Sequence, residues 1–413
     1  MLLCLAARVA LLQGLVKPVR VVGASMAEAL RGNHFELTCR DCGFPCRFDA
    51  DESPRDERVV CPNCGYVHHG FGGARADRGD RVLIDRLAYF LTAPQRWDLV
   101  AFQMPDDERL LAVKRVVGLP GERVEIRAGD IYVDGQIQRK SLAQLRSLAI
   151  LVHDSDFAAP ADRALPPRWA AETVPSGWRQ EHGAFVCEPS TGGHDWLTYR
   201  HWRCFSSPLP RTDEYPILDN YGYNQDESRQ LQRVTDLLLI CRICVVSGTG
   251  SVALRADDGR DRFEVTLDPG ARRGRLYRNG RGVLTAALPP MAYASGVNIE
   301  LALCDQRISL AIDRQTVLEH DYTPSAEDFH PTAHPLSIGA RALGISVRRL
   351  LVFRDISYLD SVGLPRDWVS PRALAADQFF VLGDNSPRSR DSRQDPRGGV
   401  SRQRFLGKVL TGR

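Results

Sequence analysis

Four cysteines in two closely spaced pairs have the spacing of metal ligands. Cys39 and Cys42 form one Cys-x-x-Cys pair, and Cys61 and Cys64 form the second. Each pair places two thiolates on one side of a tight turn, so two pairs together complete a tetrahedron around zinc. We therefore predict a structural zinc ribbon over residues 39–70, although two disulfides in an exported loop fit the same cysteines. Four thiolates leave no open coordination position, so this zinc has no predicted part in catalysis.

A polar segment near the end of the chain holds a second group of residues that could do chemistry. The apolar run Phe379–Leu382 stops at Gly383, and acids, amides, hydroxyls and arginines follow through Arg393. This pattern predicts a strand that leads into a turn rich in hydrogen-bonding groups. A solvated loop accounts for the same polarity, so composition alone leaves the role of the segment open.

Two upstream segments, taken with the polar segment, carry a family resemblance. They read GASM at residues 23–26 and LAVKRVVGLPGE at residues 111–122, and the polar segment reads FFVLGDNSPRSRDSR at residues 379–393. In this order the three segments resemble type I signal peptidases, the Ser/Lys endopeptidases that remove signal peptides from exported proteins. The resemblance covers less than half of the chain, over roughly residues 15–38, 77–137 and 371–413.

The resemblance implies a catalytic role for three residues. Ser25 matches the nucleophile, Lys114 matches the general base, and Ser389 matches the serine that hydrogen-bonds to the lysine and orients it. A lysine accepts a proton only when it is neutral, and burial in apolar surroundings lowers its pKa toward that state. The valines beside Lys114 would supply such surroundings. The alternative for Lys114 is a solvated basic position on a sheet edge.

The resemblance also implies supporting and substrate-binding residues. Two ion pairs would hold the catalytic loop without touching substrate: Asp391 with Arg393, and Asp384 with Arg115. The residues that match the walls of shallow substrate pockets are Val21, Met26, Leu30 and Val113. No catalytic cofactor is implied.

Two departures from the family pattern concern the neighbourhood of Ser25. Gly23 stands where many relatives carry a hydroxyl that helps to hold the oxyanion, and the Pro-Thr turn of relatives is absent after Met26. Oxyanion stabilisation would then depend on backbone N–H groups, that of Ser25 included. The departures leave an alternative function open, which is an inactive, membrane-tethered binding protein on a peptidase-like scaffold.

The partners and the location also follow from the resemblance. It implies substrates that are exported preproteins with small residues one and three positions before the cut. It further implies a bacterial cytoplasmic membrane location, with contact to lipid and an extracytoplasmic catalytic part. The 413 residues include 54 basic and 51 acidic side chains, a balance that gives no reason to expect a nucleic-acid partner.

The first 20 residues form a predicted hydrophobic anchor helix. The apolar stretch Leu2–Val16 is shorter than the ~20 residues that span a bilayer. A short or tilted anchor, an interfacial helix, the remainder of a longer span and a buried core helix are all compatible with it.

The sequence pattern of the remaining chain predicts a mainly β protein. Short alternating strands with turn signals indicate an antiparallel signal-peptidase-type β-domain, built from residues 21–137 and 371–413. Residues 138–214, with many prolines and scattered tryptophans, are expected to be an irregular insertion that packs through its tryptophans. Residues 215–360 show about eight strands and resemble a jelly-roll sandwich of the concanavalin/laminin-G type, with separate strands at Leu237–Val246 and Ser251–Arg255. The ligand of this sandwich is unknown from sequence.

Overall fold

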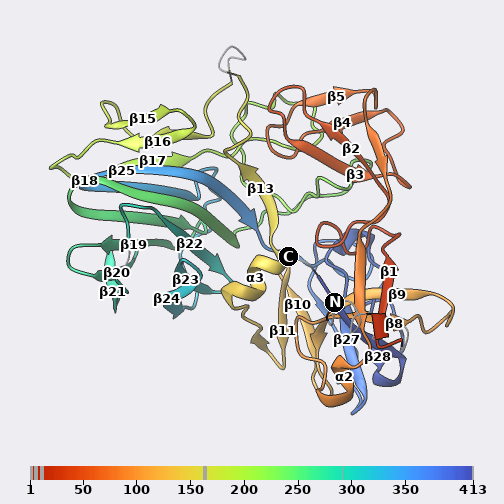
Figure 1. The fold of residues 1–413 in the computed structure, drawn as a ribbon. Helices are drawn as coiled ribbons and strands as arrows, with labels where there is room; N and C mark the ends of the chain where they lie inside the picture. Colours follow the sequence, from red (N-terminus) through yellow and green to blue (C-terminus); the bar gives the residue numbers. More distant parts are fainter. Residues whose placement is uncertain (1–2, 4–7, 10–13, 161–164, 291, 412–413) are drawn as a thin grey trace.

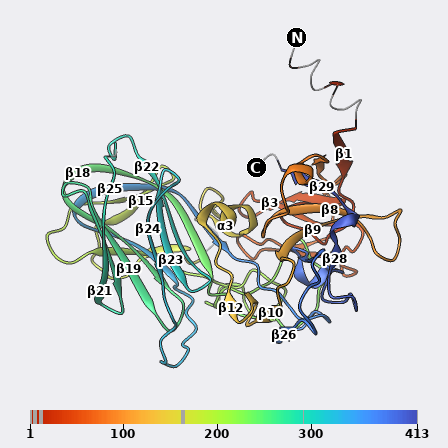
Figure 2. The same ribbon diagram turned by 90° about the horizontal axis from the view of Figure 1, so that it is seen from below.

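The computed structural model describes residues 3, 8–9, 14–160, 165–290 and 292–411, and these residues are mainly β. Figure 1 shows a β-domain that contains both ends of the described chain, a large sandwich, and a small lobe formed by strands β2–β6. The short helix α3 (Leu142–Leu148) lies between the β-domain and the sandwich in Figures 1 and 2. The predicted fold class is confirmed at this level.

The β-domain is organised around one antiparallel seven-stranded sheet. Strands from the end of the chain pair inside it with strands from the beginning, so residues separated by more than 250 positions become neighbours. In spatial order the strands are β1 (Val16–Arg20), β7 (Arg81–Asp85), β29 (Phe405–Leu410), β8 (Leu99–Gln103), β9 (Leu111–Gly118), β27 (Gln378–Leu382) and β28 (Val400–Ser401).

Strand β9 is the central strand that carries Lys114. Its residues from Lys114 to Gly118 are all buried, so both faces of the strand are covered. A second sheet packs against one face, and a core that includes Val117 and Phe380 joins the two. Its strands, in spatial order, are β12 (Gln136–Ile137), β11 (Asp130–Val133), β10 (Val124–Arg127) and β26 (Trp368–Val369). Coverage on both faces is the environment that a buried, uncharged amine requires.

The predicted N-terminal helix does not reach residue 20, although the described residues 3, 8 and 9 are helical. Residues 16–20 form strand β1, which pairs with β7, and its position at the edge of the sheet tolerates Pro18. Most of the earlier residues of the predicted helix lie outside the described part of the chain. Among the described residues, no helix has the length and apolar character needed to cross a membrane.

The lobe with the four cysteines, residues 34–77, consists of two small sheets and is called the cysteine lobe below. Each cysteine pair occupies the turn of a hairpin, with Gly43 and Gly65 at positive φ directly after the pairs. Glycine adopts this conformation without the steric cost that a side chain brings. The strands are β2 (His34–Thr38), β3 (Pro45–Asp49), β4 (Arg58–Val60), β5 (Val67–His69) and β6 (Arg75–Asp77).

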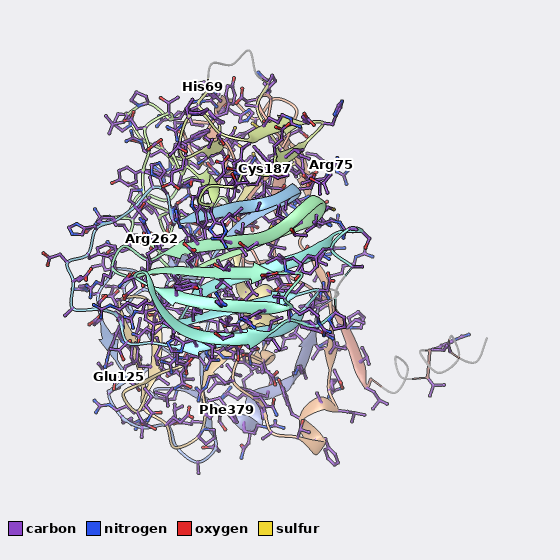
Figure 3. All side chains as sticks on the ribbon, turned by 90° about the vertical axis from the view of Figure 1, so that its left-hand side faces the viewer. His69, Arg75, Glu125, Cys187, Arg262 and Phe379 are labelled. Atoms are coloured by element: carbon purple, nitrogen blue, oxygen red, sulfur yellow. The ribbon has the colours of Figure 1, made fainter. Side chains whose placement is uncertain are left out.

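The sandwich depends on two long strands that run through both of its layers. The first part of β18 (Leu237–Asp257) pairs with β22 (Val297–Cys304), and its last part pairs with β19 (Arg262–Asp268). Strand β25 (Leu336–Arg354) follows β18 along its whole length, and bulges near residues 245–251 bend both strands. Figure 3 shows one layer face-on. The outer strands are β20 (Arg273–Arg278), β21 (Arg281–Ala287), β23 (Arg307–Ile312) and β24 (Gln315–Asp321).

Two sequence expectations about this region need correction. The strands expected separately at 237–246 and 251–255 are one bent strand. Residues 138–214 are not an irregular insertion, because five short strands lie there and all five belong to the sandwich sheet, with Trp169 and Trp178 in its core. These strands are β13 (Ile150–Asp154), β14 (Trp169–Ala171), β15 (Trp178–Glu181), β16 (Ala184–Cys187) and β17 (Asp195–Tyr199).

A buried ion cluster joins the β-domain to the sandwich. Lys140, just after β12, places its Nζ atom 2.7 Å from a carboxylate oxygen of Asp305 and 2.7 Å from one of Asp355. Asp236 and Cys304 of the sandwich lie beside these two acids. The ammonium is thus held by carboxylates that come from the other domain.

Candidate active site

Ser25 and Lys114 come together in the β-domain. Ser25 lies in the turn region that follows β1, and Lys114 is four residues into β9. The Lys114 Nζ atom lies 2.5 Å from the Ser25 Oγ atom, which is a hydrogen-bond contact. Lys114 is 4% exposed, whereas Ser25 is partly exposed. The hydroxyl is therefore open to a substrate on one side while the amine is enclosed.

The environment of Lys114 favours the neutral amine. Burial lowers the pKa of Lys114 from 10.5 to about 8, because the ammonium form loses its hydration. The carboxylates of Asp391 and Asp384 act in the opposite direction, and the Arg393 guanidinium lowers the pKa further. Near neutral pH a useful fraction of the lysine can accept a proton.

The next residue on β9, Arg115, makes a buried two-point ion pair with Asp384. The Arg115 Nε atom lies 2.8 Å from one carboxylate oxygen, and a terminal nitrogen lies 2.5 Å from the other. Arg115 also donates to the Trp97 carbonyl at 2.8 Å. This pair joins β9 to the turn after β27, and it has the partners that the resemblance implied.

Asp391 and Arg393 form a second ion pair in the polar turn, and their side chains are completely buried.

The hydrogen-bond partner of Ser389 is not the one that the resemblance implied. Its Oγ atom donates to Asp391 Oδ2 at 2.5 Å, and that carboxylate also accepts from the Gly383 N–H. The structure therefore gives Ser389 a carboxylate partner in place of the lysine, because the nearby acid is the stronger acceptor.

The turn after β27 lies directly against the Ser25 backbone. A Cβ atom built on Gly383 would lie 2.4 Å from the Ser25 carbonyl oxygen, so only glycine allows this approach. The Asn385 N–H donates to the same carbonyl at 3.1 Å, and its side-chain nitrogen donates to the Ala24 carbonyl at 3.1 Å. These bonds fix the nucleophile segment against the polar turn.

Sequence reasoning missed three residues at this site. Asn385 stands inside the quoted GDN motif, which was the available signal for it. Asn224 exchanges two amide hydrogen bonds with Asn385, each 2.8 Å, and the Tyr221 hydroxyl donates to the Asp384 carbonyl at 2.8 Å. Asn224 and Tyr221 come from residues 215–236, where no motif marked them.

The four expected substrate-contacting residues gather in one apolar cluster. Met26 and Leu30 are buried in it, at 1% and 3% exposure, while Val21 and Val113 are partly exposed at its edge. Only the two valines are therefore open to a bound peptide in this conformation. Met26 and Leu30 lie beneath them as packing.

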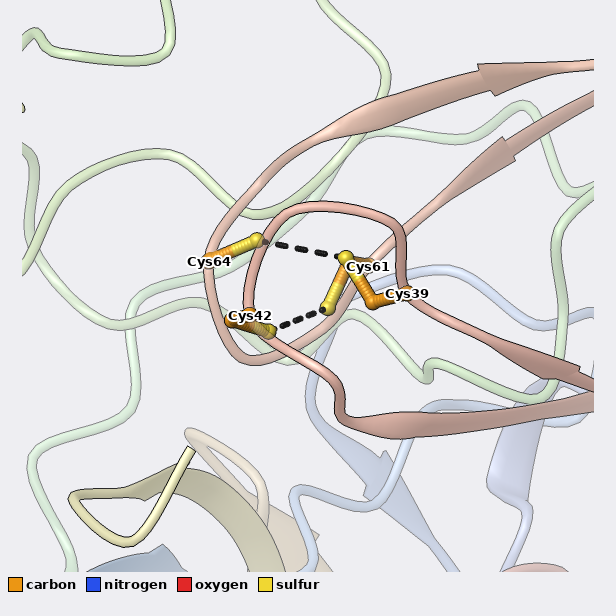
Figure 4. Close-up of side chains that lie close together, drawn as sticks. All are labelled: Cys39, Cys42, Cys61 and Cys64. Carbon is orange, nitrogen blue, oxygen red and sulfur yellow. Dashed lines mark hydrogen bonds between the residues drawn. The ribbon is translucent and has the colours of Figure 1, made fainter. Parts of the chain in front are cut away.

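The four cysteine thiols converge at one point of the cysteine lobe, as Figure 4 shows. The Cys39–Cys64 and Cys42–Cys61 sulfur distances are both 3.7 Å, too long for the ~2.05 Å of a disulfide bond. A tetrahedron with Zn–S distances of about 2.3 Å has edges of about 3.8 Å. The donor set and its geometry fit zinc.

A second group of potential ligands is the acidic cluster at the domain junction, with Asp236, Cys304, Asp305 and Asp355 close together. Lys140 already supplies a cation to two of these acids. The cluster therefore has a structural explanation that needs no metal ion.

Comparison with known proteins gives a family match over part of the chain. The family described as signal peptidase, peptidase S26, matches residues 74–177, which include Lys114 but not Ser25. Signal peptidase I V of Bacillus subtilis is 33% identical over 82 residues, which is 19% of this chain and 48% of that protein. Probable signal peptidase I-1 of Synechocystis is 34% identical over 67 residues, 14% of this chain and 34% of that protein. The chain thus spans a third to a half of these relatives.

Solved structures also align with part of the chain. The carbohydrate-binding module CBM66 of Bacillus subtilis covers 45% of this chain at 11% identity, with 95% of that module aligned and a TM-score of 0.29. The lumenal domain of VIP36 covers 51% of this chain at 9% identity, with 91% of that domain aligned and a TM-score of 0.31. The family match includes Lys114, and together with the signal peptidase relatives it supports a peptidase of the signal-peptidase type.

Proposed function

We propose that this chain is a serine endopeptidase that removes signal peptides from exported preproteins, with Ser25 as nucleophile and Lys114 as general base. The observation that carries the proposal is the enclosed Lys114 amine 2.5 Å from the Ser25 hydroxyl. Among the described residues, no carboxylate forms an ion pair with Lys114, so its proton is not held in place. Burial without a counter-ion disfavours the ammonium form, and groups perturbed in this way are common at catalytic sites.

The chemistry begins with proton transfer from Ser25 Oγ to the neutral Lys114 amine. With a pKa of about 8, roughly a tenth of Lys114 is neutral at pH 7, against well under a thousandth at the ordinary lysine value. Ser25 Oγ attacks the scissile carbonyl, and Lys114 then gives the proton to the leaving amine. Water, deprotonated by Lys114, hydrolyses the acyl-enzyme and restores Ser25.

Backbone donors would stabilise the oxyanion. Within the described chain, the Ser25 N–H donates to no other group, so it is available for the tetrahedral intermediate. Gly23 offers no hydroxyl for this purpose. Asp391, Arg393, Asp384 and Arg115 would hold the turn that fixes Ser25, and Ser389 would act on Lys114 through Asp391.

The finer features follow the signal-peptidase resemblance. We expect preproteins with small residues one and three positions before the cut, bound against Val21 and Val113. We expect the protein at the bacterial cytoplasmic membrane, with the catalytic part outside and in contact with lipid.

The four thiols of the cysteine lobe would hold a structural zinc ion. When bound, the ion would cross-link the two hairpin turns and supply no catalytic step. Elemental analysis of the purified chain should give one zinc per chain. A Cys61→Ser variant should lose it, and a metal-free chain with two disulfides would contradict this assignment.

Acylation of Ser25 tests the catalytic proposal against an inactive scaffold. A penem inhibitor should add its mass to the wild-type chain at Ser25, located by peptide mass spectrometry. The Ser25→Ala chain should remain unlabelled. A folded wild-type chain that neither acylates nor cleaves a preprotein would be the tethered binding protein instead.

A further inference from the structure

We infer that Asn224 and Gln225 are positioning residues that hold the Ser25 nucleophile and tie it to the cysteine lobe. This inference rests on the proposed function, because it assigns two further residues to the same site. Both lie in the loop at residues 215–236, outside every segment that resembles the peptidase family.

The Asn385 side chain has a complete set of partners only when Asn224 is present. Asn385 is fully buried, and one of its amide hydrogens bonds the Ala24 carbonyl. Its second hydrogen goes to Asn224 Oδ1, and its oxygen accepts from Asn224 Nδ2, both at 2.8 Å. This reciprocal pair fixes the orientation of the Asn385 amide and therefore the position of the peptide before Ser25.

Gln225 carries the connection from Asn224 to the cysteine lobe. Its oxygen accepts from the Val60 N–H at 2.8 Å, and its nitrogen donates to the Val60 carbonyl at 3.1 Å. Val60 directly precedes Cys61, one of the four converging thiols. Gly222 packs on Pro62, where an added Cβ would lie 3.0 Å from the proline ring. The loop is therefore fastened to the hairpin that a metal would stiffen.

The Gln225 contact lies on the wall of a cavity. A cavity of about 1080 Å³ separates residues 51–58 of the lobe from residues 204–231, and Val60, Asn224 and Gln225 lie on its wall. Apart from the Gln225 contact, Arg388 bridges the two sides through ion pairs with Glu52 and Asp226. The buried Tyr223 holds the loop as well, because its hydroxyl donates to the Asn33 carbonyl at 2.9 Å and its carbonyl accepts from the Asp49 N–H at 3.0 Å. Of these contacts, the Gln225 pair is made to the residue directly before Cys61.

Loss of the Asn224 amide should change the chemical step more than substrate binding. Asn385 would keep a buried amide with two unmade hydrogen bonds, so the Ala24–Ser25 peptide would lose its fixed position. A displacement of about 1 Å at a nucleophile lowers the rate by roughly a hundredfold. Val21 and Val113, which would contact the substrate, remain in place.

The first test compares Asn224→Ala with Asn220→Ala. Asn220 lines the same cavity and bonds only the Cys204 carbonyl through its side chain, so it is a matched control. We expect Asn224→Ala to lower kcat by about ten- to a hundredfold with KM nearly unchanged. Asn220→Ala should keep the wild-type values. Wild-type kcat in a folded Asn224→Ala chain would overturn the inference, whereas a wild-type chain that cleaves nothing would instead overturn the proposed function.

The second test uses Asn224→Asp, which keeps the shape of the amide. A protonated carboxyl can both donate to and accept from Asn385, but a carboxylate can only accept. Burial and the Glu227 carboxylate, whose oxygen lies 3.5 Å from Asn224 Nδ2, favour the protonated form. The ratio of variant to wild-type kcat should rise about tenfold from pH 8 to pH 6. A ratio that does not change with pH would contradict the role of the amide pair.

The third test measures the coupling between metal and nucleophile. Zinc is removed from the wild-type and Gln225→Ala chains with a chelator, and acylation of Ser25 by the penem and metal content are followed together. Metal removal should slow acylation about tenfold in the wild type and clearly less in Gln225→Ala, since the connection is already broken. Equal losses in the two chains would show that Gln225 does not transmit the effect.

Discussion

Two buried lysines in this molecule have opposite charge preferences. Lys114 in the dyad is 4% exposed and Lys140 at the domain junction is 7% exposed, so their burial is nearly the same. Lys114 contacts the neutral Ser25 hydroxyl, whereas Lys140 contacts Asp305 and Asp355 and lies over the Trp97 ring. Burial lowers the pKa of Lys114 to about 8, and for Lys140 the two carboxylates outweigh burial and raise the pKa well above its ordinary value.

The comparison shows that contact with ionised partners, and not depth alone, decides the charge of a buried lysine. Asp384 and Asp391 lie close enough to influence Lys114, but Arg115 and Arg393 neutralise them at short range. At the junction, Lys140 is the cation for a group of acids that includes Asp236, whose pKa rises to about 7 mainly through burial. One arrangement favours a neutral amine, and the other favours an ammonium that cross-links two domains.

The largest expected effect comes from removing either member of the dyad. Ser25→Ala and Lys114→Met should each lower the rate of preprotein cleavage by about a thousandfold or more. Lys114→Met should also keep or increase stability at pH 7, because an ammonium that is costly to bury is replaced by an apolar side chain. Cleavage of a purified preprotein and thermal unfolding measure the two effects. Near wild-type turnover in either variant would refute the dyad.

Lys140→Met is the matched substitution at the other lysine. It leaves buried carboxylates without their cation, so the free energy of unfolding should fall by about 3–5 kcal/mol. The chemical step should be unaffected in the folded protein, because Lys140 does not contact the dyad. Urea unfolding and kcat at low temperature separate these outcomes. A loss of kcat without a loss of stability would show that Lys140, like Lys114, acts in the chemical step and is not a structural cross-link.

The pH dependence of cleavage should report the Lys114 pKa. The active form is the neutral amine, so kcat/KM should fall about tenfold for each pH unit below about 8 and level off above it. The same lowered pKa implies that Lys114 reduces stability below pH 8 and that this cost disappears as the pH rises toward 10.5. Rates measured from pH 6 to 9 test the first statement. A flat profile over this range would rule out Lys114 as the titrating base.

The smallest expected kinetic effect is the shift of the pH profile in Asp384→Asn, a variant that also loses stability because the buried Arg115 guanidinium loses its carboxylate. The Asp384 carboxylate raises the pKa of Lys114, so its removal should move the acid limb of the rate profile to lower pH, by less than about one unit. Asp377→Asn, which changes an exposed acid that bonds Ser401, is the control and should leave the limb in place. A shift of the acid limb to higher pH would mean that the Asp384–Arg115 pair lowers the pKa of Lys114 and does not raise it.

Local patterns predicted much of the fold, and long-range contacts account for what was missed. The Asp134-Gly135 turn and strand β29 follow from short sequence signals. The single bent strand β18 was divided in two because Ser-Gly-Thr-Gly at residues 247–250 has the composition of a turn, yet it stays extended and exposed at the bend. Prolines concealed the short strands at residues 150–199, whose pairing depends on β25, far away in sequence.

For the candidate site, the family resemblance supplied the residues that chemistry alone could not select. Nothing in the composition around Ser25 distinguishes it from a serine in an ordinary turn. Asn224 and Gln225 had no signal at all, because a polar loop that packs and a polar loop in water have the same composition. Their importance depends on Asn385 and Val60, which lie 161 and 165 residues away along the chain.

The pairing of β27 with β9 also determines when the β-domain can be completed during synthesis. Ser25 and Lys114 emerge early, but the Gly383–Asn385 turn that braces the serine is translated only after the whole sandwich. During synthesis the Ser25 and Lys114 segments would therefore wait, without their bracing turn, until residues 383–385 have been translated.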